Sequence, residues 1–202
     1  MGGMNERLPY EVKKPSKFRF VKVGRGRLAL YHRPRRETFT SLRRKGCTHI
    51  VTLLKDVEDA DFYGDLTRQA GMQWIWLPVP NGKYPQKDVH ERLINAMPEL
   101  SRLLDEGNTL LIHCSAGIHR TGTVAYGLLR WRGVDSERAM RIIRRTRKET
   151  AEGMMDKRKK WGDDNARLAP QDSTWSTSVK KFVNQLQTRL FKPRSTPTPN
   201  DG

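Results

Sequence analysis

The chain has 202 residues, with 39 Lys and Arg against 22 Asp and Glu, and a formal net charge of +17. This length fits one domain with irregular ends, and two cysteines are too few for a disulfide framework, so we expect a reducing compartment. No apolar run is long enough to span a membrane and no signal-peptide core is present, so we expect a soluble cytoplasmic chain, with the nucleus as a second location.

The charge itself leaves two readings open. A surplus of +17 predicts affinity for polyanions such as phosphoproteins, inositol phosphates, anionic membranes or RNA. A solvated basic surface that only keeps the chain in solution explains the same number.

The first residues predict a flexible lead-in over 1–14, followed by the main domain over 15–192. Residues 18–23 alternate apolar and basic side chains, which is typical of a half-exposed strand, and residues 27–31 form a second strand. The glycines at 24 and 26 lie between two strands with no helix after them, so they indicate a hairpin turn rather than a nucleotide loop.

Helix and strand patterns then alternate, which favours an α/β fold with a central, mostly parallel sheet flanked by helices. The expected order is a helix over 37–45, a strand over 47–54, a helix over 58–70 and a strand over 73–79. Cys47 begins the first of these two strands and is expected to be a small core residue. The alternative is a resolving thiol that protects a second cysteine.

The second half continues the alternation. A loop over 80–85 precedes a helix over 88–106, which Asp88 could cap and which Pro98 would kink or divide. A strand over 109–112, a helix over 123–131 and a helix from Asp135 or Ser136 to about 148 follow. We further expect a C-terminal helix over 179–191 and a disordered tail over 193–202.

A basic segment over 141–160 has three interpretations. It is a solvated helix face and loop, a nuclear-import signal, or a docking patch for an acidic partner or RNA.

The most informative stretch runs from His113 to Gly122, between an apolar strand and a helix. A tight loop of small residues at a helix start is an anion site, because backbone N–H groups converge there and the helix dipole adds positive charge. A thiol in that loop, at Cys114, is expected to lose its proton easily. The planar fork of Arg120, six positions later, can grip two oxygens of one phosphate. This chemistry predicts attack of Cys114 on a phosphoryl group, followed by hydrolysis of the cysteinyl-phosphate.

The pattern of His113, Cys114, Arg120 and Thr121 resembles the H-C-x5-R-[ST] loop of cysteine-dependent protein tyrosine and dual-specificity phosphatases. In plan the chain is similar to the kinase-associated and the plant and fungal atypical dual-specificity phosphatases. The resemblance implies a protein tyrosine phosphatase-like fold that works without metal or cofactor.

The same resemblance implies the roles of the site residues. Cys114 is the nucleophile, Arg120 is the clamp for the phosphate and the transition state, Thr121 hydrogen-bonds the sulfur, and His113 tunes the cysteine from the interior. His119 either meets the substrate or faces solvent. The amides of the loop would bind the phosphate oxygens, together with Arg120; the loop residues are Ser115, Ala116, Gly117, Ile118 and His119.

One expected residue is missing. In the family an aspartic acid on a separate loop protonates the leaving oxygen, and residues 77–85 fit that loop with Asn81 in the position of the acid. An amide cannot act as an acid. Either another carboxylate donates the proton, or the leaving group needs little help, or the domain binds phosphate without efficient turnover. The candidate carboxylates are Asp56, Asp59, Asp61 and Asp88.

We therefore predict a phosphatase for phosphate monoesters, with phosphotyrosine or mixed phosphoprotein substrates as the first choice. Inositol phosphates, phosphoinositides or RNA 5′ phosphates are the enzymatic alternative. A phosphate-binding pseudophosphatase is the alternative of another class.

Overall fold

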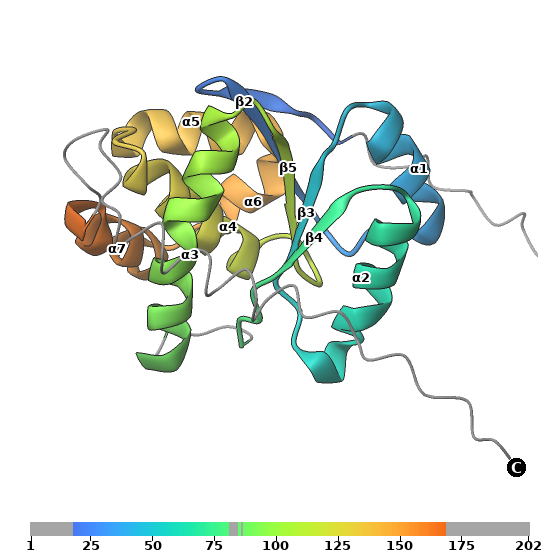
Figure 1. Ribbon diagram of the computed structural model, residues 1–202. Coiled ribbons are helices and arrows are strands. Elements are labelled where there is room, and N and C mark those ends of the chain that lie inside the picture. Colours follow the sequence, from blue (N-terminus) through green and yellow to red (C-terminus); the bar gives the residue numbers. More distant parts are fainter. Residues whose placement is uncertain (1–17, 81–84, 86, 169–202) are drawn as a thin grey trace, which may run out of the picture.

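The computed structural model describes residues 18–80, 85 and 87–168 (Figure 1). The expectations for 1–14, for Asn81 and for the C-terminal helix and tail lie outside these residues. The described strands are β1 (Val21–Val23), β2 (Gly26–Tyr31), β3 (His49–Thr52), β4 (Gln73–Trp76) and β5 (Thr109–His113). The helices are α1 (Arg36–Arg44), α2 (Ala60–Gln69), α3 (Lys87–Asp105), α4 (His119–Trp131), α5 (Ser136–Thr146), α6 (Lys148–Glu152) and α7 (Asp156–Asn165), with 3-10 turns η1 (Asp56–Glu58) and η2 (Ala166–Leu168).

The five strands form one sheet in the order β1-β2-β5-β3-β4. β1 pairs antiparallel with β2, as the expected hairpin, and the other neighbouring strands are parallel. The predicted α/β class with a mostly parallel sheet is confirmed.

Helices cover both faces of the sheet (Figure 1). α1 and α2 lie on one face over a core that includes Phe39, Leu42 and Tyr63. α3 and α4 lie on the other face over a larger core, which α5, α6 and α7 extend. This three-layer arrangement buries both faces of the parallel strands, as such sheets require.

β5 occupies the middle of the sheet, and all five of its residues are buried. Its last residue, His113, is level with Tyr31 at the end of β2 and with Thr52 at the end of β3. Three parallel strands therefore end together, and the loops that follow them meet at one edge. In open α/β sheets this carboxyl edge is where ligands bind.

Several elements have other bounds than the sequence predicted. Three strands are shorter, at Val21–Val23, His49–Thr52 and Gln73–Trp76 against the expected 18–23, 47–54 and 73–79, and three helices differ for local reasons. The helix expected over 58–70 starts later, because η1 precedes it and Asp59 adopts a left-handed conformation with φ of 62°. α3 runs without a break through Pro98, so the division into two helices is wrong. α4 begins at His119 rather than at residue 123, because the loop after β5 leads directly into the helix.

The basic segment is more structured than the expected solvated face and loop. Arg147 is extended between α5 and α6, and α7 follows. Trp161 in α7 is fully buried, and the positions of Gly127 in α4 and Gly162 leave room for it and for Tyr126. We missed α7 because mostly charged and polar residues surround this one aromatic anchor.

Among residues 18–80, 85 and 87–168, no helix combines the length and the apolar composition needed to cross a bilayer.

Candidate active site

The loop between β5 and α4 surrounds the thiol of Cys114. Cys114 is 3% exposed, and the backbone N–H of Gly117 donates a hydrogen bond to its Sγ at 3.2 Å. Gly117 has a φ of 69°, and a Cβ at this position would lie 2.3 Å from the carbonyl oxygen of Tyr31. Only glycine combines that conformation with so close a neighbour. Gly117 thus allows the chain to curl around the sulfur.

Neighbouring elements hold the loop through its carbonyl oxygens. The N–H of Arg33 donates to Ser115 O at 2.9 Å, and the hydroxyl of Thr150 donates to Gly117 O at 2.5 Å. The Nη2 of Arg147 donates to Ala116 O at 3.3 Å. Because these carbonyls are fixed from outside, the loop is preorganised before any anion arrives.

Arg120 is the second residue of α4, and its side chain is 4% exposed. Its Nη1 donates to Glu58 Oε2 at 2.7 Å and lies 3.2 and 3.3 Å from the carbonyl oxygens of Val79 and Leu53. Its Nη2 donates to Glu58 Oε1 at 2.9 Å. A guanidinium has five N–H donors. These contacts leave Nε and one Nη2 proton, which form the other edge of the fork, for a second anion.

The charges of this pair reinforce each other. Hydrogen bonds from Arg120 lower the pKa of Glu58 to about 2, against the opposing effect of partial burial. Burial alone would lower the pKa of Arg120, but Glu58 and the nearby Cys114 thiol raise it overall. Both groups of the pair are therefore charged at neutral pH.

Behind the cysteine, His113 is fully buried at the end of β5, as the resemblance implied. Its Nε2 lies 2.9 Å from Thr52 Oγ1, which also accepts a hydrogen bond from Trp74 Nε1 at 2.8 Å. Burial lowers the pKa of His113 to about 3, so the ring is neutral at physiological pH. An indole N–H only donates, so the Thr52 hydroxyl is free to donate its own proton to His113.

One expected contact is absent, and the position of His119 agrees with both of its alternatives. The hydroxyl of Thr121 is buried but has no hydrogen-bond partner among the described residues, so the expected bond to the sulfur is not formed in this structure. His119 is exposed at the start of α4, and partial burial lowers its pKa. Its ring is thus accessible to solvent. Ile118 packs against Gly153, just after α6.

The candidate acids are distributed over three places: the turn after β3, the start of α2 and the start of α3. Asp56 and Asp59 are exposed and flank Glu58 on the turn after β3, next to the residue that holds Arg120. Asp61 lies in the first turn of α2 and Asp88 in that of α3. In the described part of the chain, no three His, Cys, Asp or Glu side chains gather where a metal ion could bind.

Glu58 is the site residue that sequence reasoning missed. It was interpreted only as the start of a helix, although an acidic residue shortly after a buried strand of a parallel sheet lies at the edge where ligands bind, and this signal could have found it.

Cys47 does not serve as a resolving thiol for Cys114. Its Sγ lies 3.6 Å from the carbonyl oxygen of Thr109, the first residue of β5, whereas Cys114 follows the last. One strand of five residues, about 16 Å at 3.3 Å per residue, separates the two, while a disulfide needs Cα atoms within about 7 Å. Burial raises the pKa of Cys47 to about 12. The core interpretation is therefore correct.

A buried cysteine whose sulfur accepts a hydrogen bond from a backbone amide of its loop, beside an arginine that a carboxylate holds, is the arrangement of a cysteine-dependent phosphatase. The sequence over residues 16–174 matches the family described as "Swiss Army Knife protein, DSP-PTPase phosphatase domain" (PTP-SAK). The chain belongs to this family, and the resemblance to the dual-specificity phosphatase superfamily is confirmed. A search of curated proteins gave no match.

Solved phosphatase structures share the fold. Tk-PTP in its active form aligns with a TM-score of 0.58 and 23% identity, covering 73% of this chain and 95% of that chain. Kinase associated phosphatase (KAP), with its catalytic-site cysteine replaced by serine, gives 0.56 and 21%, covering 72% and 88%. PTPMT1 in complex with PI(5)P gives 0.57 and 15%, covering 75% and 99%.

Proposed function

We propose that Cys114 is the nucleophile and that Arg120 clamps the transferred phosphoryl group. The sulfur attacks phosphorus, the ester oxygen leaves with a proton, and a cysteinyl-phosphate forms. Water then attacks the same phosphorus, which releases inorganic phosphate and restores the thiolate. The amides of residues 115–120 stabilise the phosphoryl oxygens, on which negative charge develops in both steps.

The observation that carries this proposal is that the two edges of the Arg120 guanidinium have different surroundings. Glu58 and two carbonyl groups hold one edge, and the other edge remains available on the side of Cys114. An arginine held in this way needs no rearrangement before it binds a phosphate. Preorganised donors of this kind are commonly the largest contribution to catalysis.

We propose phosphotyrosine in proteins as the first substrate class. The sequence has an amide, Asn81, where the family has its acid, so substrates with better leaving groups are favoured. A phenol, with a pKa near 10, leaves more easily without protonation than the alkoxide of serine.

Hydrolysis of an aryl phosphate by the native chain and by Cys114→Ser tests the mechanism. We expect turnover by the native chain, none by Cys114→Ser, and a phosphorylated Cys114 after rapid acid quenching. If the native chain binds phosphopeptides without turnover, the domain is the phosphate-binding pseudophosphatase instead.

Phosphoinositides are the second candidate substrate class. The similar structure of PTPMT1 contains PI(5)P, and the charge of +17 suits an anionic lipid surface. A side-by-side panel of phosphotyrosine peptides, phosphoinositides, soluble inositol phosphates and RNA with 5′ phosphates discriminates between the classes by kcat/KM. A higher value on phosphoinositides would replace our first choice.

A further inference from the structure

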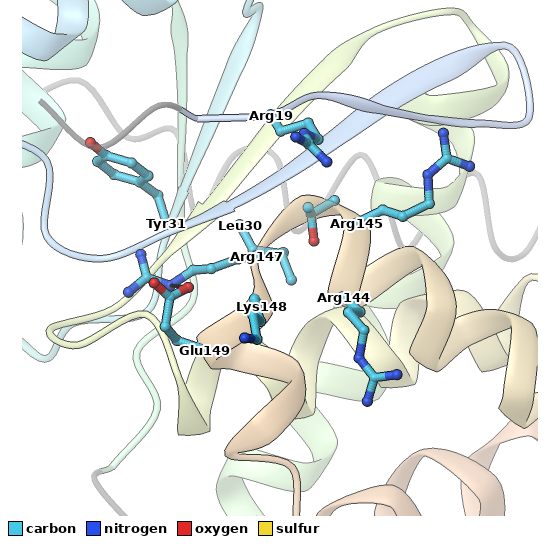
Figure 2. A pocket seen from close by; sticks show the side chains of 9 residues that line it. Arg19, Leu30, Tyr31, Arg144, Arg145, Arg147, Lys148 and Glu149 are labelled. Atoms are coloured by element: carbon cyan, nitrogen blue, oxygen red, sulfur yellow. Dashed lines mark ion pairs between the residues drawn. The ribbon is translucent and has the colours of Figure 1, made fainter.

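A cavity lies beside the phosphate loop and has a volume of about 230 Å³ (Figure 2). Arg19 and β2 form one wall, and the end of α5 with the start of α6 forms the other. Its lining residues are Arg19, Leu30, Tyr31, Arg144, Arg145, Thr146, Arg147, Lys148 and Glu149. We call it the arginine pocket.

The lining of the arginine pocket is strongly positive, with five cationic side chains and one carboxylate, Glu149. Arg19, Arg144 and Arg145 form no ion pair with any carboxylate of the described residues. Figure 2 shows Arg19 reaching over the cavity, while Arg144 and Arg145 extend outward from α5. Exposed side chains change rotamer within nanoseconds, so these two can turn toward an anion.

Arg147, which lines the pocket beside Glu149, provides a second, independent indication. Its Nε is buried, has no hydrogen-bond partner within the described residues, and lies 3.7 Å from Glu149 Oε2, beyond hydrogen-bond distance. A buried donor without a partner is costly, which points to an acceptor that the protein itself does not supply.

The pocket is also connected to the phosphate loop. Arg147 donates to Ala116 O, and the carbonyl of Tyr31, another lining residue, touches Gly117. The extended conformation of Arg147 between α5 and α6 makes this contact possible.

We propose that the arginine pocket binds a diphosphate group, as a site separate from the phosphate loop. Several guanidinium forks grip phosphate oxygens in pairs, which two adjacent phosphates satisfy better than one. A volume of about 230 Å³ is below the 300–1,000 Å³ of sites for larger ligands, so it suits the diphosphate itself, and any group attached to the diphosphate would lie outside the cavity.

The test measures binding of inorganic pyrophosphate by calorimetry at physiological ionic strength. It uses the full chain with Cys114→Ser, so it needs no turnover and can fail or succeed independently of the proposed phosphatase activity. The pocket variant adds Arg144→Gln and Arg145→Gln. The matched control adds Arg44→Gln and Arg138→Gln, two exposed arginines outside the pocket that remove the same charge.

We expect the pocket variant to lose one binding event, or to weaken it at least tenfold, while the control changes less than twofold. Inorganic phosphate should bind this site more weakly than pyrophosphate. ADP is tested in the same way. If ADP binds more tightly than pyrophosphate, a nucleotide is the source of the diphosphate; if the two bind equally, the ligand is a free diphosphate.

Equal losses in the pocket and control variants would overturn the proposal, since they would show only the effect of net charge. A single site that survives both Arg144→Gln with Arg145→Gln and a separate Arg19→Gln would also overturn it. Circular dichroism checks that each variant is folded.

Discussion

The carboxylate of Glu58 holds both terminal nitrogens of Arg120, at 2.7 and 2.9 Å, across 62 positions of sequence. The turn after β3 thereby fixes the orientation of a side chain from α4. Glu58 contacts Arg120 and not the sulfur, so we regard it as a positioning residue.

Substitution Glu58→Gln should lower kcat about 10- to 100-fold on aryl phosphates, with a smaller change in KM. The amide keeps one acceptor but loses the charge that orients the guanidinium. Steady-state kinetics checks this, with Glu91→Gln, an exposed glutamate of α3, as the control. An unaltered kcat would show that the carbonyls of Leu53 and Val79 suffice to hold Arg120.

The same pair should make stability depend on acid pH. The pKa of Glu58 is about 2 in the folded chain against an ordinary 4.5, so the unfolded state takes up a proton first as pH falls. The stabilisation is complete above about pH 5 and is lost between about pH 4.5 and 2. Its size is on the order of 1–2 kcal/mol after screening by solvent. Urea unfolding at about pH 6 and pH 3 should show a larger loss for the native chain than for Glu58→Gln; parallel losses would contradict the assignment.

Thr52→Val should reduce the free energy of unfolding by about 1–3 kcal/mol, because it leaves Trp74 Nε1 and His113 Nε2 without their shared partner. Thr67→Val is a matched control, since within the described residues that buried hydroxyl bonds only to Tyr63 O in its own helix. Urea denaturation measures both. If Thr67→Val loses as much free energy of unfolding as Thr52→Val, the hydrogen bonds that Thr52 shares with Trp74 and His113 add no stability beyond that of an ordinary buried hydroxyl.

Gly117→Ala should lower kcat about a hundredfold or more, because the added Cβ collides with Tyr31 O and deforms the loop. Gly133→Ala separates this collision from backbone strain. Gly133 has a similar φ of 74° but nothing within 4 Å of the new Cβ, so it should cost about 1–2 kcal/mol of stability and leave kcat intact. Retained activity in Gly117→Ala would show that the loop tolerates a different path.

Asn81→Asp should raise kcat on phosphotyrosine substrates about tenfold or more, and less on pyrophosphates, if the acid is truly missing. Asn108→Asp, at the opposite end of β5, adds the same charge away from the site. The pH profile of kcat should gain a new descending limb on the alkaline side, where the new acid loses its proton. No gain on either substrate would indicate that another carboxylate, such as Asp56 or Asp59, already donates.

The sequence was sufficient for features that depend on neighbouring residues. The order of strands and helices follows from short hydrophobic patterns and from glycines that end helices. In the loop from His113 to Gly122, the spacing between Cys114 and Arg120 can be read directly from the sequence. The position of Arg120 in that loop could therefore be predicted, although the partner of its guanidinium could not.

Contacts between distant segments were beyond such reasoning. Glu58 meets Arg120, and Thr52 meets His113, only because β3 lies beside β5 in a particular register. α7 was missed for a related reason. Trp161 is buried because Gly127 in α4 leaves room for it, and Gly127 lies 34 positions earlier in the sequence. Composition within one segment contains no information about such neighbours.

The central place of β5 has a consequence for how the protein acquires its chemistry. Its neighbours come from earlier in the chain and the helices that support its loop come later, so neither half of the polypeptide contains a working centre. The return of aryl phosphate hydrolysis after dilution from denaturant would consequently mark the final docking event of refolding, whereas circular dichroism would register helices that form before it.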